Sequence, residues 1–344
     1  MKEIRSIISK YEQLKSTGTK MALATVVNVE HSSYRRSGAR MLIMEDGTWI
    51  GGISGGCLEG DTLKKAMYAI HKNEAVKVTY DTREDDASQI GVGLGCNGLI
   101  DVLIIPISDL ETNPIEILKI VVDRRTPSIL LTSLENGKSE DCTINKSTSQ
   151  ALDQEIDTVK SNAQSRKIDL YDGYFIEYLQ PEIKLFVFGR NYDVIPLAQI
   201  AKNIGWEINI VAKPLKVSKQ IFGLVDKVIN PYKTPIKTDD YSVALLMSHD
   251  YKTDKDNLVM LQKHNLKYIG LLGPKSRKEK ILNELNDLGI TVRRGNIFGP
   301  MGLDTGATSP EEIAISIIAE IRACFAGRNG GRLRDRKTSI HITE

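Results

Sequence analysis

Residues 51 to 61 of the chain read GGISGGCLEGD, with glycines and a serine around one cysteine, Cys57. The stretch stands between extended segments and a helix. Before it, residues 40–44 and 48–50 are predicted to form two short strands joined by a turn at Asp46-Gly47. After it, apolar side chains recur at helical spacing. They are Leu58, Leu63, Ala66, Met67 and Ile70. The sequence therefore predicts that Cys57 lies at or near the start of a helix.

A helix start presents unpaired backbone N–H groups and the positive end of the helix dipole, and both favour negative charge. A thiol placed there is expected to ionise more readily than a free one. The glycines let the chain turn sharply and let a ligand approach bare amides, which predicts an anion cradle. Its members are Gly51, Gly52, Gly55 and Gly56. The alternative is that Cys57 is a small buried hydrophobe in a tight strand-to-helix turn.

Two neighbouring segments carry further candidates. Residues 31–41, HSSYRRSGARM, follow a buried strand predicted at 21–29. Their three guanidiniums, on Arg35, Arg36 and Arg40, are of the type that holds phosphate oxygens bidentately, although a solvated basic loop is the alternative. Residues 89–106, QIGVGLGCNGLIDVLIIP, carry Cys96 on a second glycine-rich loop directly into a strand predicted at 99–105. Cys96 either converges with Cys57 on one site or is structural.

The composition limits the class of protein. At 344 residues the chain predicts two or three domains, and 41% hydrophobic with 26% charged residues is typical of a soluble globular protein. A net charge of +2 gives no general reason to expect nucleic-acid or membrane binding. We find no long apolar run and no signal-peptide region, so a cytoplasmic protein is expected. The cysteines form no CxxC pair, which argues against zinc ribbons and a disulfide framework.

The second half of the chain alternates strands and helices. An apolar strand at 185–188, Gly189, a helix at 194–204 and a strand at 207–211 follow the order of a dinucleotide-binding unit. Strands are also predicted at 227–229, 243–247 and 268–272, and capping boxes at 276–279 and 309–312. The predicted fold is α/β: an N-terminal α/β domain (1–110) with the cysteine loops, a connecting segment (111–180), a Rossmann-like doubly wound parallel sheet (181–330) and a basic tail (331–344).

The dinucleotide fingerprint is incomplete. Asn191 stands where G-x-G-x-x-G has its second glycine, and Ala212 stands where an acid would hold a ribose hydroxyl. NAD(P) is therefore a doubtful ligand. His249 follows a strand, at the edge where such sheets bind ligands. It is an acid, a base or a ligand, or it caps its own loop by hydrogen bonds.

Taken together, these motifs make the chain resemble the xanthine dehydrogenase accessory protein family, XdhC/CoxI. The resemblance is carried by HSSYRRSGARM, GGISGGCLEGD and GLGCNG in the first half, and by FVFGRNYDV, SHDYKTD and MGLDTGATSPEEIAISIIAEI in the second. It implies a non-catalytic, homodimeric chaperone that binds the molybdenum cofactor (molybdopterin). Such a protein supports sulfuration of the cofactor with a cysteine desulfurase and inserts it into a xanthine dehydrogenase-type molybdenum hydroxylase.

The resulting site prediction combines both halves of the chain. The soft Cys57 thiolate is a candidate for contact with molybdenum through the bound cofactor. The predicted cofactor-binding residues are Ser54, Gly55, Gly56, Cys57, Cys96, Arg35, Arg36, Arg40, Gly189, Asn191 and His249. Two alternatives stay open: an NAD(P)-dependent oxidoreductase that uses the C-terminal domain with His249 as acid, and a scaffold that only docks the desulfurase and the hydroxylase.

Overall fold

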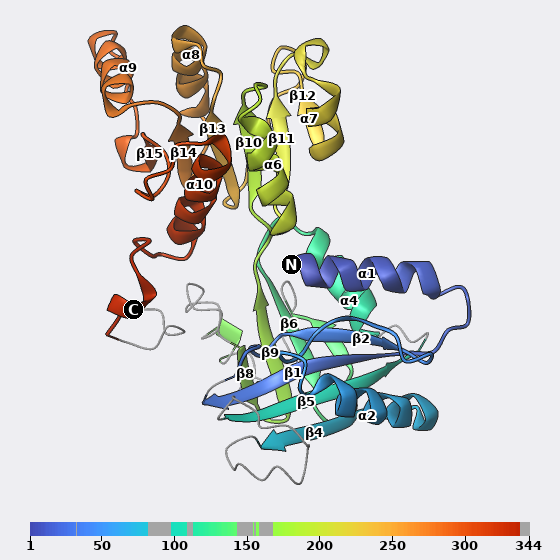
Figure 1. Cartoon of the computed structure of the whole chain (residues 1–344). Helices are drawn as coiled ribbons and strands as arrows, with labels where there is room; N and C mark the ends of the chain where they lie inside the picture. Colours follow the sequence, from blue (N-terminus) through green and yellow to red (C-terminus); the bar gives the residue numbers. More distant parts are fainter. Residues whose placement is uncertain are drawn as a thin grey trace. The chain divides into compact units, whose positions relative to one another are not determined.

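The computed structural model describes residues 1–31, 33–81, 98–108, 113–142, 154, 156–157 and 168–337. The chain divides into two compact units, Met1–Pro181 (unit 1) and Glu182–Glu344 (unit 2), and each is described by itself (Figure 1). The second glycine-rich loop, including Cys96, lies outside the described residues. So do the polar stretch at 143–153 and Ser32.

Unit 1 is built on an antiparallel sheet. Among the described residues it has five strands, in the order β3-β2-β1-β5-β4. They are β3 (Trp49–Gly51), β2 (Arg40–Met44), β1 (Met21–His31), β5 (Gly98–Ile107) and β4 (Val76–Asp81). The predicted hairpin is present: β2 pairs with β3, and the turn closes with a 3.0 Å bond from the Gly47 N–H to the Met44 carbonyl.

Both faces of this sheet are covered. Helix α2 (Glu59–Lys72) packs on the face that carries Ala22, Ala24 and Val26, and α1 (Lys2–Leu14) and α4 (Pro114–Asp123) pack on the opposite face (Figure 1). A second antiparallel sheet, with the described order β7-β6-β9-β8, also lies against that opposite face. Its strands are β7 (Ser139–Asp141), β6 (Ser128–Ser133), β9 (Tyr174–Leu179) and β8 (Ile168–Tyr171).

Unit 2 is the doubly wound parallel sheet that the sequence predicts. Its six described strands run in the order β12-β11-β10-β13-β14-β15 and all pair in parallel. They are β12 (Lys227–Ile229), β11 (Glu207–Val211), β10 (Lys184–Phe188), β13 (Ser242–Leu246), β14 (Tyr268–Leu271) and β15 (Ile297–Phe298). The strand order reverses direction between β10 and β13. A ligand crevice is expected above that pair, at the carboxyl ends of the strands.

Helices cover both faces of the parallel sheet. Helices α6 and α10 pack on one face, and α8 and α9 on the other. The helices of unit 2 are α6 (Val194–Asn203), α7 (Lys219–Leu224), α8 (Tyr251–Leu261), α9 (Lys275–Asp287) and α10 (Pro310–Phe325). Short 3-10 turns lie at Pro214–Lys216, Arg294–Asn296 and Leu333–Asp335. Among the described helices, we find none with the length and apolar character needed to cross a bilayer.

The two predicted capping boxes have different outcomes. At α10, Ser309 accepts from the Glu312 N–H while the Glu312 carboxylate accepts from the Ser309 N–H, so this box is confirmed. The box predicted at Ser276 is wrong. Helix α9 begins at Lys275 with Pro274 as its N-cap and no side-chain cap. Pro274 is itself extended, with φ −67° and ψ 159°, and the helix starts at the next residue, so Ser276 falls inside the first turn.

Candidate functional site

Cys57 lies just before a helix, as its position in the sequence predicts. Helix α2 begins at Glu59 with Leu58 as its N-cap, two residues after the cysteine. The Cys57 side chain is half-buried and packs at the margin of the core between the sheet and α2. The thiol is therefore neither sealed in the core nor fully exposed.

The carboxylate of Glu59 closes the loop that carries Cys57. It accepts hydrogen bonds from the N–H groups of Ile53 at 3.2 Å and Ser54 at 2.9 Å, and from the Ser54 hydroxyl. Burial alone would raise the pKa of Glu59, but the hydrogen bonds from Ser54 and Ile53 outweigh burial and lower it. The loop thus folds around an anion that the chain itself supplies.

Ser54 takes up two more of the loop's amides. Its hydroxyl oxygen accepts from the N–H groups of Gly56 and Leu58, both at 3.1 Å. Within the described part of the chain, the N–H groups of Gly55 and Cys57 are the ones in this loop without a hydrogen-bond acceptor, and Gly55 is exposed. The amide cradle predicted from the glycines is therefore smaller than the sequence suggests, because Ser54 and Glu59 occupy most of it.

Two glycines are required by the backbone rather than by a ligand. Gly51 has φ +86°, and a Cβ there would lie 2.3 Å from the Arg40 carbonyl oxygen. Gly56 has φ +113°, with open space around it. A Cβ on Gly55 would meet the ring of Tyr34 at 3.6 Å, and Tyr34 is 76% exposed. Tyr34 thus brings the loop of residues 33–39 against the Cys57 loop.

The three candidate arginines are not equivalent. Arg35 is ion-paired with Glu3 of α1, and that carboxylate also accepts from the Arg40 N–H at 3.1 Å. The Arg40 side chain is 3% exposed and is ion-paired with Glu177 of β9. Arg36 donates to the His31 carbonyl at 3.4 Å and has no ion pair among the described residues. Arg36 is therefore the guanidinium best placed to meet a ligand.

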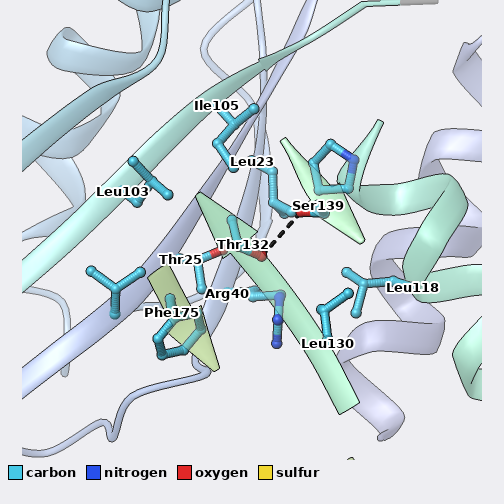
Figure 2. Close-up of a pocket in the computed structure, with 12 residues that line it drawn as sticks. Leu23, Thr25, Arg40, Leu103, Ile105, Leu118, Leu130, Thr132, Ser139 and Phe175 are labelled. Carbon is cyan, nitrogen blue, oxygen red and sulfur yellow. Dashed lines mark hydrogen bonds between the residues drawn. The ribbon is translucent and has the colours of Figure 1, made fainter. Parts of the chain in front are cut away.

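Arg40 belongs to the interior of unit 1. It lines a small cavity between the two sheets, whose lining side chains are all buried (Figure 2). Among the other lining side chains, the hydroxyls of Thr132 and Ser139 lie 3.0 Å apart in a hydrogen bond (Figure 2). The buried ion pair with Glu177 joins β2 to β9, so Arg40 connects the two sheets of unit 1.

In unit 2, Gly189 and Asn191 form the turn after β10. A Cβ on Gly189 would lie 2.5 Å from the Met247 carbonyl oxygen, so glycine is needed there for β10 and the end of β13 to approach. The Asn191 carbonyl accepts from the Val194 N–H, and the Tyr192 carbonyl from the Ile195 N–H, both at 3.1 Å. The first N–H groups of α6 are thus already bonded.

His249 lies at the crevice predicted above β10 and β13. Its Nε2 is 2.7 Å from Oδ2 of Asp193, which follows β10. His249 has φ +60°, in the left-handed region that non-glycine residues rarely adopt. The two residues line a cavity of about 150 Å³, open to solvent, with the carboxyl end of β13 at its base and α10 at its side.

Three residues at these sites were missed from the sequence: Tyr34, Glu59 and Asp193. Of these, only Glu59 could have been found from the sequence, because it is an acidic residue in the first turn of the helix that follows the glycine-rich loop. Among the described residues, no group of three His, Cys, Asp or Glu side chains can hold a metal ion.

Comparison with known proteins covers both units. Residues 14–81 match the XdhC and CoxI family, and residues 185–321 match the XdhC Rossmann domain. The chain is 28% identical over 307 residues to a probable xanthine dehydrogenase subunit of Bacillus subtilis, covering 87% of this chain and 91% of the relative. It is 21% identical over 318 residues to the molybdenum cofactor insertion chaperone PaoD of Escherichia coli, covering 92% and 87%.

A solved structure is similar along the whole chain. The crystal structure of a xanthine dehydrogenase from Bacillus halodurans superposes with a TM-score of 0.75 at 27% identity. The match covers 97% of this chain and 99% of the other. Both units therefore have counterparts in one known protein.

Proposed function

Because the chain belongs to the XdhC and CoxI family, we propose that it binds the molybdenum cofactor as cargo and inserts it into a molybdenum hydroxylase of the xanthine dehydrogenase type. The observation that carries the proposal is the match along 92% of the chain to a molybdenum cofactor insertion chaperone. The proposal includes support for sulfuration by a cysteine desulfurase, a homodimer and a cytoplasmic location. The resemblance alone supports these three details.

The donors at the Cys57 loop suit such a cargo. The cofactor carries a phosphate and an oxo-molybdenum dithiolene centre, so it is anionic. Arg36 offers a guanidinium without an ion pair among the described residues, and Gly55 and Cys57 offer two N–H groups. The Cys57 sulfur is a soft ligand that can face molybdenum or an incoming sulfur atom. Arg35 and Arg40 act indirectly, by fixing the segment that carries Arg36 against α1 and β9.

The test is cofactor retention by the full chain and two cysteine variants. The protein is purified anaerobically from a host that makes the cofactor, and molybdenum and oxidised pterin are measured per chain. Cys57→Ser should lose most of the bound cofactor while its melting temperature stays unchanged. Cys324→Ser is the matched control, because Cys324 is another half-buried thiol but lies on α10 of unit 2. Equal retention by the Cys57 variant and the wild type would refute the role of the thiol.

A further inference from the structure

The edge of unit 2 beside β12 concentrates positive charge. Residues 213–237, KPLKVSKQIFGLVDKVINPYKTPIK, hold six lysines and one acidic residue, Asp226, although the net charge of the whole chain is only +2. All six lysines are exposed, and none of them forms an ion pair with another described residue. They are Lys213, Lys216, Lys219, Lys227, Lys233 and Lys237.

Four of the six lysines gather at the carboxyl ends of β11 and β12, the last two described strands at this side of the parallel sheet (Figure 1). Three of them follow β11, in the segment that leads through a 3-10 turn into α7, and the fourth lies in the turn after β12. We call Lys213, Lys216, Lys219 and Lys233 the lysine face. Asp226 does not neutralise it, because the Asp226 carboxylate accepts a 2.8 Å hydrogen bond from the Ile208 N–H at the amino end of β11.

The two segments of the lysine face are in contact with each other. The Ala212 N–H, directly after β11, donates to the Ile229 carbonyl at the end of β12 at 3.0 Å. Lys213 Nζ lies 5.0 Å from the centre of the Tyr232 ring, in the turn after β12. The ends of the two neighbouring strands thus form one continuous cationic surface.

Apolar side chains project from the same surface. Leu215 is fully exposed between Lys213 and Lys216, and Tyr232 is 79% exposed beside Lys233. Exposed apolar groups surrounded by polar ones are typical of protein–protein interfaces. A small-molecule site instead encloses most of its ligand in a concave pocket, and a fully exposed leucine does not line such a pocket. The surface therefore suits a macromolecule.

An acidic protein fits this surface better than a nucleic acid does. Single-stranded nucleic acids stack their bases on free aromatic rings, whereas the Tyr232 ring already has Lys213 Nζ against it. A nucleic acid also offers no aliphatic partner for Leu215 apart from its bases. A protein surface with carboxylates around an apolar centre matches the lysines and Leu215 together.

We propose that the lysine face docks an acidic, partly apolar surface of the client molybdenum hydroxylase. Because the lysines form no ion pair with other described residues, they are available to the carboxylates of a partner. Such a patch acts chiefly on the rate of association, and salt screens its effect. The inference rests on the proposed function, and it adds the surface of unit 2 that recognises the client.

Association with the apo form of the source organism's xanthine dehydrogenase tests the inference. The hydroxylase is immobilised, and binding of the full chain is followed by biolayer interferometry at low and at high ionic strength. Wild-type association should slow as salt is added. At low ionic strength, reversing three charges of the lysine face should slow association by about tenfold or more. The triple variant is Lys213→Glu, Lys216→Glu and Lys233→Glu.

A second triple variant controls for the change in net charge. Its three lysines are also exposed and form no ion pair with other described residues, but they lie on or beside α8 and α9, which cover the opposite face of the sheet from α7. Association of this variant should stay close to that of the wild type. Both variants change only exposed side chains, and urea unfolding checks that they are folded. The control is Lys252→Glu, Lys263→Glu and Lys275→Glu.

Four outcomes would overturn the docking surface: wild type that does not bind the hydroxylase, lysine-face and wild-type proteins that associate equally fast, equal slowing in both triple variants, or tighter binding of poly(U) RNA than of the hydroxylase. The molybdenum and pterin content of the wild-type protein separates this inference from the proposed function. Any of the four outcomes with wild-type protein that carries molybdenum and pterin sinks the docking surface alone. Wild-type protein that carries neither sinks the proposed function itself.

Discussion

The carboxylate of Glu59 should determine the stability of the Cys57 loop. In Glu59→Ala the N–H groups of Ile53 and Ser54 lose their acceptor, and Ile53 is fully buried. An unsatisfied buried donor costs about 1–3 kcal/mol, and the N–H of the part-buried Ser54 costs about 1 kcal/mol, so the predicted loss in the free energy of unfolding is about 2–4 kcal/mol. Glu59→Gln keeps one acceptor oxygen in a side chain of the same size, and its expected cost is about 1 kcal/mol.

The two tryptophans make the measurement specific to one unit. Trp49 lies in β3 of unit 1 and Trp206 lies before β11 of unit 2, and the chain has no others. In a Trp206→Phe background, urea unfolding followed by fluorescence reports on unit 1. The reasoning is refuted if both Glu59 variants unfold within about 0.5 kcal/mol of the parent, which is the scatter expected for an ordinary surface substitution.

The same carboxylate predicts a pH dependence. The pKa of Glu59 is lowered in the folded protein from its ordinary value of 4.5. Its stabilising contribution is therefore complete above that value and is lost as the pH falls through the lowered pKa. The midpoint of urea unfolding of unit 1 should fall with pH below about 4.5 more steeply in the parent than in Glu59→Gln. Parallel curves would show that the hydrogen bonds to Glu59 do not depend on its charge.

Three further predictions concern packing and capping, each measured by urea unfolding. Arg40→Met should lower the free energy of unfolding of unit 1 by about 3–5 kcal/mol, because it leaves the buried Glu177 carboxylate without a partner. The double variant Arg40→Met with Glu177→Met should cost much less, and equal costs would contradict the buried pair. Gly189→Ala should destabilise unit 2 by about 1–3 kcal/mol, because its Cβ would lie 2.5 Å from the Met247 carbonyl oxygen. In contrast, Gly60→Ala in α2, where a Cβ meets open space, should stabilise unit 1 by about 0.5–1 kcal/mol. Ser309→Ala should cost unit 2 about 1 kcal/mol by removing the α10 cap, and no change would show that Glu312 alone suffices.

Local sequence patterns predicted much of the fold. The hairpin at Asp46-Gly47 and the parallel sheet of unit 2 follow from turn chemistry and from periodicities of 2 and 3.6 residues. The strands β7, β8 and β15 were not predicted. Each has two to four residues, too few to establish a period without a neighbouring signal such as the Asp46-Gly47 turn beside β3. The prediction that Ser276 caps a helix was wrong, because a capping motif in the sequence does not determine at which residue the helix starts.

The partners of the charged side chains were not predictable in the same way. Arg40 and Glu177 are 137 positions apart, and Asp193 and His249 are 56 apart. Such pairs depend on which strands become neighbours, and no local pattern specifies that. The basic cluster in the sequence predicts three ligand-binding arginines, and this stays a prediction. In the fold Arg35 is paired with Glu3 and Arg40 with Glu177, and Arg36 has no ion pair among the described residues.

The Glu59 carboxylate limits how many N–H groups of the Cys57 loop are left to bind an anionic cargo. A loop whose amides were all free would bind an anionic cargo through many charge-assisted hydrogen bonds, at about 1.5–3 kcal/mol each, and would release it slowly. Here Ser54 and Glu59 take four of the loop's N–H groups, so the loop keeps its shape without cargo. Under the proposed function, few donors remain for the cargo, and retention depends on the thiol and on contacts elsewhere in the chain. A cargo held by several weak contacts can be handed over stepwise, since a client enzyme needs to displace only one of them at a time.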